Sequence, residues 1–155
     1  MTVEHAVHIA AAPDVVWAVT EDVERWPEWQ PTVTSVRRLD AGPFGVGSAA
    51  RIKQPLQPAA TWTVMDHAPG RRFAWEARQP GLRFVGTHEV AADGAGTTSR
   101  LRVEATGPLA VVLWPLLGPA TRWALRQENG GLKRRCEARG PGRRGSGSVP
   151  LHSRG

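Results

Sequence analysis

A histidine and an aspartate are the side chains in this sequence best suited to move a proton. His88 lies in the segment 82–91, where alternation puts it on the same side as Phe84 and Val90, so we expect it to face the interior. Its imidazole has a free pKa of about 6.5 and can act as an acid or a base near neutral pH. Asp66 offers a carboxylate whose pKa would rise on desolvation, towards that of a useful base. Both residues also have a purely structural interpretation, His88 as a core histidine and Asp66 as the start of a turn.

Tryptophan dominates the aromatic content. The chain has seven tryptophans, three phenylalanines and no tyrosine. Broad apolar rings suit stacking on an aromatic or polycyclic ligand. We expect Trp17 to be core, whereas Trp26, Trp29, Trp62 and Trp75, spread over a loop and neighbouring strands, are interpreted equally well as core or as the lining of a pocket.

The elements that must position these side chains can be predicted from periodicity and turn residues. Alternation predicts a first strand over 3–9, and Pro13 suits the first turn of a helix. A second helical turn is expected around 25–29. Turn residues then separate six more strands, near 33–40, 48–54, 59–67, 71–79, 82–91 and 96–106. Residues 109–139 predict a long C-terminal helix with interruptions at Pro115, at Gly118-Pro119 and at Gly130-Gly131.

Three stretches of sequence carry a resemblance to a known family. They are IAAAPDVVWAVTEDVERWPEWQPTV at 9–33, GRRFAWEA at 70–77 and GAGTTSRLRV at 94–103. In this order, and with His88 between the last two, they resemble the START-like (SRPBCC) superfamily, polyketide cyclase/dehydrase and lipid-transport type. The resemblance implies an α+β helix-grip fold: a seven-stranded antiparallel sheet around a long C-terminal helix, with two short helices after the first strand. We expect residues 1–139 to form this domain and 140–155 to be a disordered basic tail.

The helix-grip fold implies a ligand cavity between the sheet and the terminal helix. On the 59–67 strand the resemblance favours Trp62, Val64 and Asp66 as inward residues. Residue parity in the strands, together with the resemblance, predicts a substrate-binding set of Trp26, Trp29, Trp62, Val64, Phe73, Trp75, Phe84 and Val103.

Two functions follow from the resemblance. One is a polyketide cyclase or dehydratase that uses His88 and Asp66 as proton-transfer groups on a polycyclic or polyketide-type substrate. The alternative is a carrier of a hydrophobic metabolite or lipid, which needs only an apolar cavity. The chain departs from the aromatic polyketide cyclases in having no tyrosine, and in having Ala68 where an arginine is expected. An inward polar pair within hydrogen-bonding reach would favour the enzyme, and single polar groups the carrier.

The charge is confined to one end of the chain. The net charge is +6, and from residue 133 onward there are seven basic residues against one acid, so residues 1–132 are neutral. We therefore expect no nucleic-acid partner, although an interaction module acting through this basic end is a third interpretation. The single cysteine, Cys136, excludes an intrachain disulfide, and no zinc-ligand spacing occurs.

Several further expectations concern partners and location. We expect no metal, no cofactor, no signal peptide and no membrane-spanning segment, because the longest apolar run, at 109–117, is too short and contains a proline. The expected protein is cytoplasmic, and a monomer or a homodimer.

Overall fold

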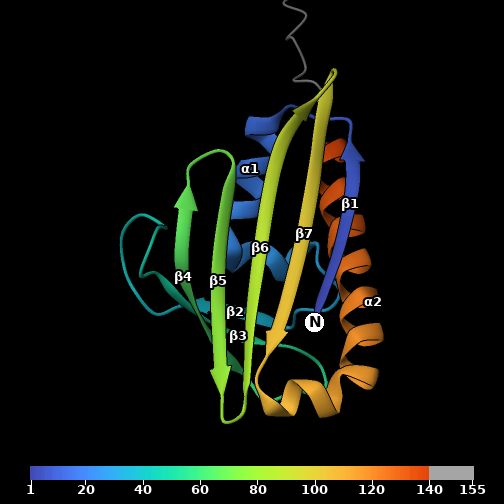
Figure 1. Ribbon diagram of the computed structural model, residues 1–155. Coiled ribbons are helices and arrows are strands. Elements are labelled where there is room, and N and C mark those ends of the chain that lie inside the picture. The colour runs from blue at the N-terminus through green and yellow to red at the C-terminus, as the bar shows by residue number, and fades with distance from the viewer. Residues whose placement is uncertain (140–155) are drawn as a thin grey trace, which may run out of the picture.

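The computed structural model describes residues 1–139 as one antiparallel sheet with helices against one face (Figure 1). The sheet has seven strands in the order β1-β7-β6-β5-β4-β3-β2. In chain order the elements are β1 (Thr2–Ile9), α1 (Pro13–Glu21), η1, a short 3₁₀ helix (Val23–Glu28), β2 (Ser35–Arg38), β3 (Ala49–Lys53), β4 (Ala60–Ala68), β5 (Arg72–Gln79), β6 (Leu82–Asp93), β7 (Gly96–Thr106) and α2 (Pro108–Ala138). The predicted helix-grip fold is therefore confirmed, whereas the prediction for 140–155 lies outside the described residues.

Tight hairpins connect the long strands. Gly81 joins β5 to β6 with a φ of 73°, and Gly94 joins β6 to β7 with a φ of 61°. These values lie in the left-handed region, where glycine has no Cβ to clash with the backbone. The hairpins fix the register, and so set which residues share a face of the sheet.

Helix α2 runs unbroken through the glycines and prolines that predicted interruptions. In Figure 1 its first turns lie across the lower end of the sheet and the remainder runs beside β1. It packs mainly on β1 and β7. Its first half carries exposed apolar side chains, among them Val112 and Leu116. None of the helices within residues 1–139 is both long and apolar enough to cross a bilayer.

The core lies between the sheet and the helices. The inner face contributes Val64, Phe73 and Trp75, while α1 and η1 contribute Trp17 and Trp26. A smaller cluster of Val3, Leu101 and Leu125 joins α2 to β1 and β7. The largest side chains on the inner face are aromatic, so the space between the sheet and the helices is apolar and filled by rings.

Candidate active site

His88 and Glu128 form a buried pair in the interior. His88 lies on β6, and its Nε2 is 2.8 Å from Oε1 of Glu128 on α2. Their side chains are only 8% and 11% exposed. The Nδ1 atom of His88 is buried and has no hydrogen-bond partner. When Nε2–H donates to the carboxylate, the imidazole presents the Nδ1 lone pair as a free proton acceptor.

Strand register and helical spacing explain why both residues face the interior. His88 faces inward because its register partners, Phe73 on β5 and Leu101 on β7, are buried core residues. Glu128 occupies the buried face of α2, between Leu125 and Leu132. Those positions are three and four residues away, so they share one face of a helix. Sequence reasoning missed Glu128, although this spacing marks it as an inward acid.

Aromatic rings enclose the imidazole of His88. The ring of Phe73 stacks on it, with centroids 4.5 Å apart and planes 11° from parallel. Trp26 lies 5.2 Å away and Trp75 lies 6.0 Å away, nearly at a right angle. The indole of Trp26 is itself fixed, because its Nε1–H donates to the carbonyl of Thr20. The pair therefore occupies a site of low polarity, where electrostatic interactions are stronger than in water.

The predicted substrate-binding residues lie on the inner side of the structure. Trp26, Val64, Phe73 and Trp75 belong to the main core cluster, with Trp29 and Trp62 packed against it.

Two further members of the predicted set lie on neighbouring strands. Phe84 is opposite Ala105 on β7, and Val103 is opposite Gly86 on β6. Gly86 leaves space for indoles, since a Cβ there would lie 3.3 Å from the ring of Trp75 and 3.6 Å from that of Trp62. Contact with a ligand remains a prediction for all eight residues.

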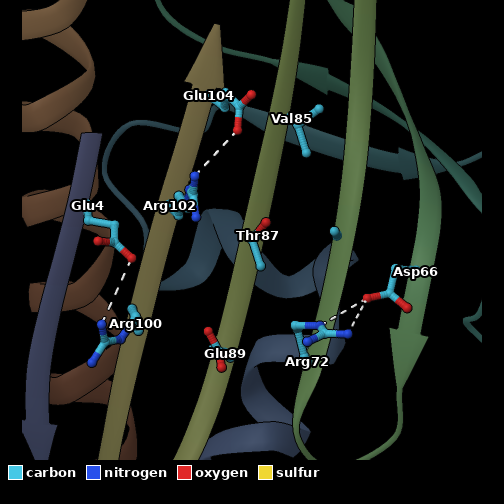
Figure 2. Close-up of a pocket in the computed structure, with 10 residues that line it drawn as sticks. Glu4, Asp66, Arg72, Val85, Thr87, Glu89, Arg100, Arg102 and Glu104 are labelled. Carbon is cyan, nitrogen blue, oxygen red and sulfur yellow. Dashed lines mark hydrogen bonds and ion pairs between the residues drawn. The ribbon is translucent and has the colours of Figure 1, made fainter. Parts of the chain in front are cut away.

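The inward placement predicted for Asp66 is wrong. A β-bulge between Val64 and Asp66 adds a residue to β4, so the alternation of faces is interrupted there. The Asp66 carboxylate lies on the outer face, with Oδ2 2.6 Å from Nη2 of Arg72 (Figure 2). It therefore does not lie beside His88, and Glu128 supplies the carboxylate instead.

The bulge turns His67 inward. Its ring lies 5.9 Å from both Trp17 and Phe44, and its Nε2 is 3.5 Å from Oε2 of Glu21. That separation is long for a hydrogen bond, and Nε2 is buried without a partner. Parity reasoning missed this second inward histidine because the bulge has no clear sequence signal.

A second polar cluster adjoins the first on α2. Asn129 is fully buried, and its side chain accepts a hydrogen bond from Ser99 Oγ at 2.9 Å. Its Nδ2 donates to the carbonyl of His5 at 3.1 Å and lies 2.9 Å from the Nδ1 of that histidine. Burial, and then the charge of Arg126, lower the pKa of His5. The cluster ties α2 to β1 and β7, and so fixes the position of the neighbouring Glu128.

An arginine reaches the inner side from β2 and not from the position of Ala68. Arg38 shares a face of β2 with Val36, and its guanidinium carbon lies 5.7 Å from the centre of the Phe44 ring. Asp40 Oδ2 lies 2.8 Å from its Nη2, and the carbonyl of Gly42 accepts a hydrogen bond from Nη1. This arginine is thus engaged by its own loop.

Two depressions on the surface are lined largely by charged side chains, unlike the aromatic interior. One lies on the outer face of the sheet and is lined by charged residues (Figure 2). Its arginines are paired with carboxylates, such as Arg100 with Glu4 and Arg102 with Glu104. The other lies between α1 and the end of α2, where Arg25 and Arg135 also have acidic partners. Trp29 is the one aromatic side chain that lines either of these two depressions, so neither offers an apolar ligand the aromatic surroundings of the interior.

The architecture and the site together define a class of protein. A curved antiparallel sheet grips a long C-terminal helix, and a histidine–carboxylate pair lies between them among aromatic rings. Within residues 1–139, no group of three or more His, Cys, Asp or Glu side chains could hold a metal ion. This is a helix-grip domain of the START-like class.

Comparison with known proteins gives the family. Residues 1–137 match the family described as polyketide cyclase / dehydrase and lipid transport, and the chain belongs to that family. Uncharacterized proteins of Mycobacterium tuberculosis and Mycobacterium bovis are 25% identical over 144 residues, which cover 87% of this chain and 84% of theirs.

Solved structures share the fold. The protein TTHA0849 from Thermus thermophilus matches with a TM-score of 0.73 at 19% identity, over 91% of this chain and all of that one. The ZhuI aromatase/cyclase from Streptomyces sp. R1128 has a TM-score of 0.65 at 24% identity, over 90% and 98% of the two chains. The di-domain aromatase/cyclase StfQ of the steffimycin pathway has a TM-score of 0.73 at 17% identity, over 89% of this chain and 51% of that one.

Proposed function

We propose that this protein binds a hydrophobic, polyketide-type substrate between its sheet and α2, and there catalyses an aldol cyclisation or a dehydration by acid/base chemistry. The observation that carries the proposal is the buried pair of His88 and Glu128, with its unpartnered Nδ1. The family, and the two aromatase/cyclases that share the fold, support the substrate class.

The pair favours an enzyme over a carrier. Burying polar and ionisable groups is unfavourable unless they are fully hydrogen-bonded, and Nδ1 of His88 is not. A carrier of an apolar molecule needs only apolar walls. An inward histidine held by an inward carboxylate is instead the arrangement of a general base and the group that orients it.

In each of the two proposed steps, Nδ1 of His88 takes one methylene proton and delivers it to an oxygen. Nδ1 of His88 takes a proton from a methylene carbon between two carbonyls, and the resulting enolate carbon bonds to a second carbonyl carbon. The imidazolium returns its proton to the alkoxide so formed, which becomes a hydroxyl group. In the dehydration, Nδ1 removes the remaining methylene proton, and the hydroxyl leaves as water with the proton that the imidazolium supplies. The Glu128 carboxylate holds Nε2–H and stabilises the imidazolium in both steps.

Binding requires aromatic rings to move. The interior is filled by indole and phenyl groups, of which Trp26, Phe73 and Trp75 are almost fully buried. Trp29, Phe44 and Trp62 are only partly buried. We assign the entry of the substrate to these partly exposed rings, because their displacement disturbs the fewest packed contacts.

The test uses His88→Gln and a matched control. A minimal polyketide synthase supplies a linear poly-β-ketone thioester, and the cyclised aromatic product is measured against the spontaneous rate. We expect the wild type to accelerate the reaction and His88→Gln to lower turnover by roughly 10²-fold. His8→Gln, which changes a histidine that is 53% exposed, should leave the rate unchanged.

Further measurements separate catalysis from binding and folding. Thermal unfolding shows whether each variant is folded, and quenching of tryptophan fluorescence by pyrene measures binding. Glu128→Gln keeps an acceptor oxygen for Nε2 but removes the charge, so turnover should fall while pyrene still binds. A folded His88→Gln with wild-type turnover contradicts the proposal. So does a wild type that binds pyrene and accelerates nothing, and that result identifies a carrier.

A further inference from the structure

The first half of α2 exposes apolar side chains to solvent, most of them along one stripe; Val111, which is 68% exposed, lies outside it. Residues 109, 112, 113, 116 and 123 follow helical spacing, and we call them the α2 apolar face: Leu109, Val112, Leu113, Leu116 and Trp123. Val112 is 72% exposed, Leu116 74% and Trp123 58%. Contiguous apolar surface of this kind marks a site of interaction with another molecule or with a membrane.

The stripe does not form part of the core. On the opposite side of the same helical segment, Ala110 and Gly118 are buried, so the segment already packs against the body of the protein. Near its start Leu109 meets the β5–β6 turn, where a Cβ on Gly81 would lie 3.0 Å from Cγ of Leu109. Apart from Leu109, which meets this turn, the α2 apolar face has no covering element among residues 1–139.

The charges that the first half of α2 itself carries are all of one sign. Between residues 108 and 127 the charged residues are Arg122 and Arg126, and there is no aspartate or glutamate. Both arginines are exposed. The outer face of the sheet differs, because its arginines are paired with carboxylates there (Figure 2). The first half of α2 therefore combines an apolar stripe with an uncompensated positive charge.

Two kinds of partner could cover the α2 apolar face, and these properties favour one of them. A second copy of the chain, docked about a two-fold axis, would present the same arginines from both partners at one interface, which is repulsive. An anionic lipid bilayer presents negative phosphates above an apolar interior, and so matches both the arginines and the stripe. Tryptophan is also the side chain that favours the boundary between headgroups and acyl chains. The charge complementarity favours the bilayer.

We propose that the α2 apolar face docks this protein reversibly on an anionic lipid bilayer. Helix α2 changes direction after its first turns and packs on the sheet beyond them, so this face lies along the membrane surface and does not cross it (Figure 1). Leu116 and Trp123 enter the boundary between headgroups and acyl chains. Arg122 and Arg126 contact lipid phosphates. The docking is independent of any reaction at His88.

Cosedimentation with vesicles tests the docking. The full chain is mixed with phosphatidylcholine vesicles that either contain or lack phosphatidylglycerol. We expect binding to the anionic vesicles, weaker binding to the neutral ones, and weakening by added salt. Leu116→Glu should lower the partition coefficient by about tenfold or more, since it replaces an inserted apolar group by a charge. Arg122→Gln should lower binding to anionic vesicles by about fivefold.

A matched control exists on another part of the surface. Val46, in the connection between β2 and β3, is 69% exposed, and Val46→Glu should not change vesicle binding. All three substitutions fall on exposed residues, so circular dichroism should show an intact fold. Equal binding by Leu116→Glu and the wild type, or no binding of the wild type to anionic vesicles, overturns the proposal. If sedimentation velocity instead shows a dimer that Leu116→Glu dissociates, without vesicle binding, the face belongs to a second copy.

Discussion

Two adjacent glycines of α2 should respond in opposite ways to the same substitution. Gly→Ala inside a helix normally stabilises it by about 1 kcal/mol, because alanine loses less backbone freedom on folding. At Gly130 a Cβ would meet only Nη1 of Arg134, at 3.4 Å, which is the mobile end of a long side chain. We therefore expect Gly130→Ala to raise the free energy of unfolding by about 1 kcal/mol.

Gly131 faces a backbone atom that cannot easily move. A Cβ there would lie 2.2 Å from the carbonyl oxygen of Trp29, whereas an ordinary contact between carbon and oxygen is about 3.3 Å or more. Helix and loop must therefore separate by about 1 Å. Overpacking costs ~1–3 kcal/mol, and a clash with a backbone atom belongs at the upper end, about 3 kcal/mol against a helical gain of about 1 kcal/mol. We expect Gly131→Ala to lower the free energy of unfolding by about 2 kcal/mol, which is about 3 kcal/mol below Gly130→Ala.

Urea denaturation followed by tryptophan fluorescence measures both variants. At the size of this chain, a difference of about 3 kcal/mol corresponds to roughly 10 °C in Tm, so thermal unfolding gives an independent check. The same displacement should reach the site, because Glu128 lies one turn before Gly131 on the same helix. Equal stabilities for Gly130→Ala and Gly131→Ala would refute the close packing of α2 on Trp29 and the reasoning built on it.

Two further predictions concern titratable groups. Burial raises the pKa of the Cys136 thiol to about 11. Labelling by a thiol reagent at pH 8 should therefore be slow, and it should accelerate when urea unfolds the protein. Fast labelling of the native protein would contradict this burial. Burial and the charge of Arg126 lower the pKa of His5 below 6.5, so an NMR titration should show a midpoint below that value, and Arg126→Gln should raise it. Because the unfolded chain binds the proton more readily, His5 should lower stability as the pH falls below 6.5, and Arg126→Gln should lessen that loss. An unchanged His5 midpoint in Arg126→Gln would show that the two groups do not interact.

Much of the fold could be predicted from local sequence, because its strands alternate and its hairpins end in turn residues. The predicted segment 82–91 corresponds to β6, and 96–106 to β7. The helix was harder to delimit, since Gly130-Gly131 predicts an interruption by propensity alone. In the structure, Gly131 lies against the backbone of Trp29, where a larger residue would clash. Local sequence patterns carry no information about this tertiary contact.

The candidate site, like the fold, could be predicted from the sequence only in part. Parity predicted that His88 faces inward, because the residues around it in β6 alternate without interruption. Its partner Glu128 lies forty positions further on, and their contact depends on how α2 is rotated on the sheet. Spacing within α2 could have marked Glu128 as inward, but which strand it meets is fixed by long-range packing.

The bulge in β4 explains why only one of the two predicted acid/base residues faces inward. His88 does, and Asp66 does not. One extra residue after Val64 sends both Met65 and Asp66 outward and returns His67 to the inner face. If β4 had supplied the carboxylate, hydrogen bonds between neighbouring strands would fix its distance from His88. Because α2 supplies it through Glu128, that distance depends on how closely the helix docks. The close approach at Gly131 and the hydrogen bonds of Asn129 are therefore the contacts that hold the site together, although neither residue touches His88.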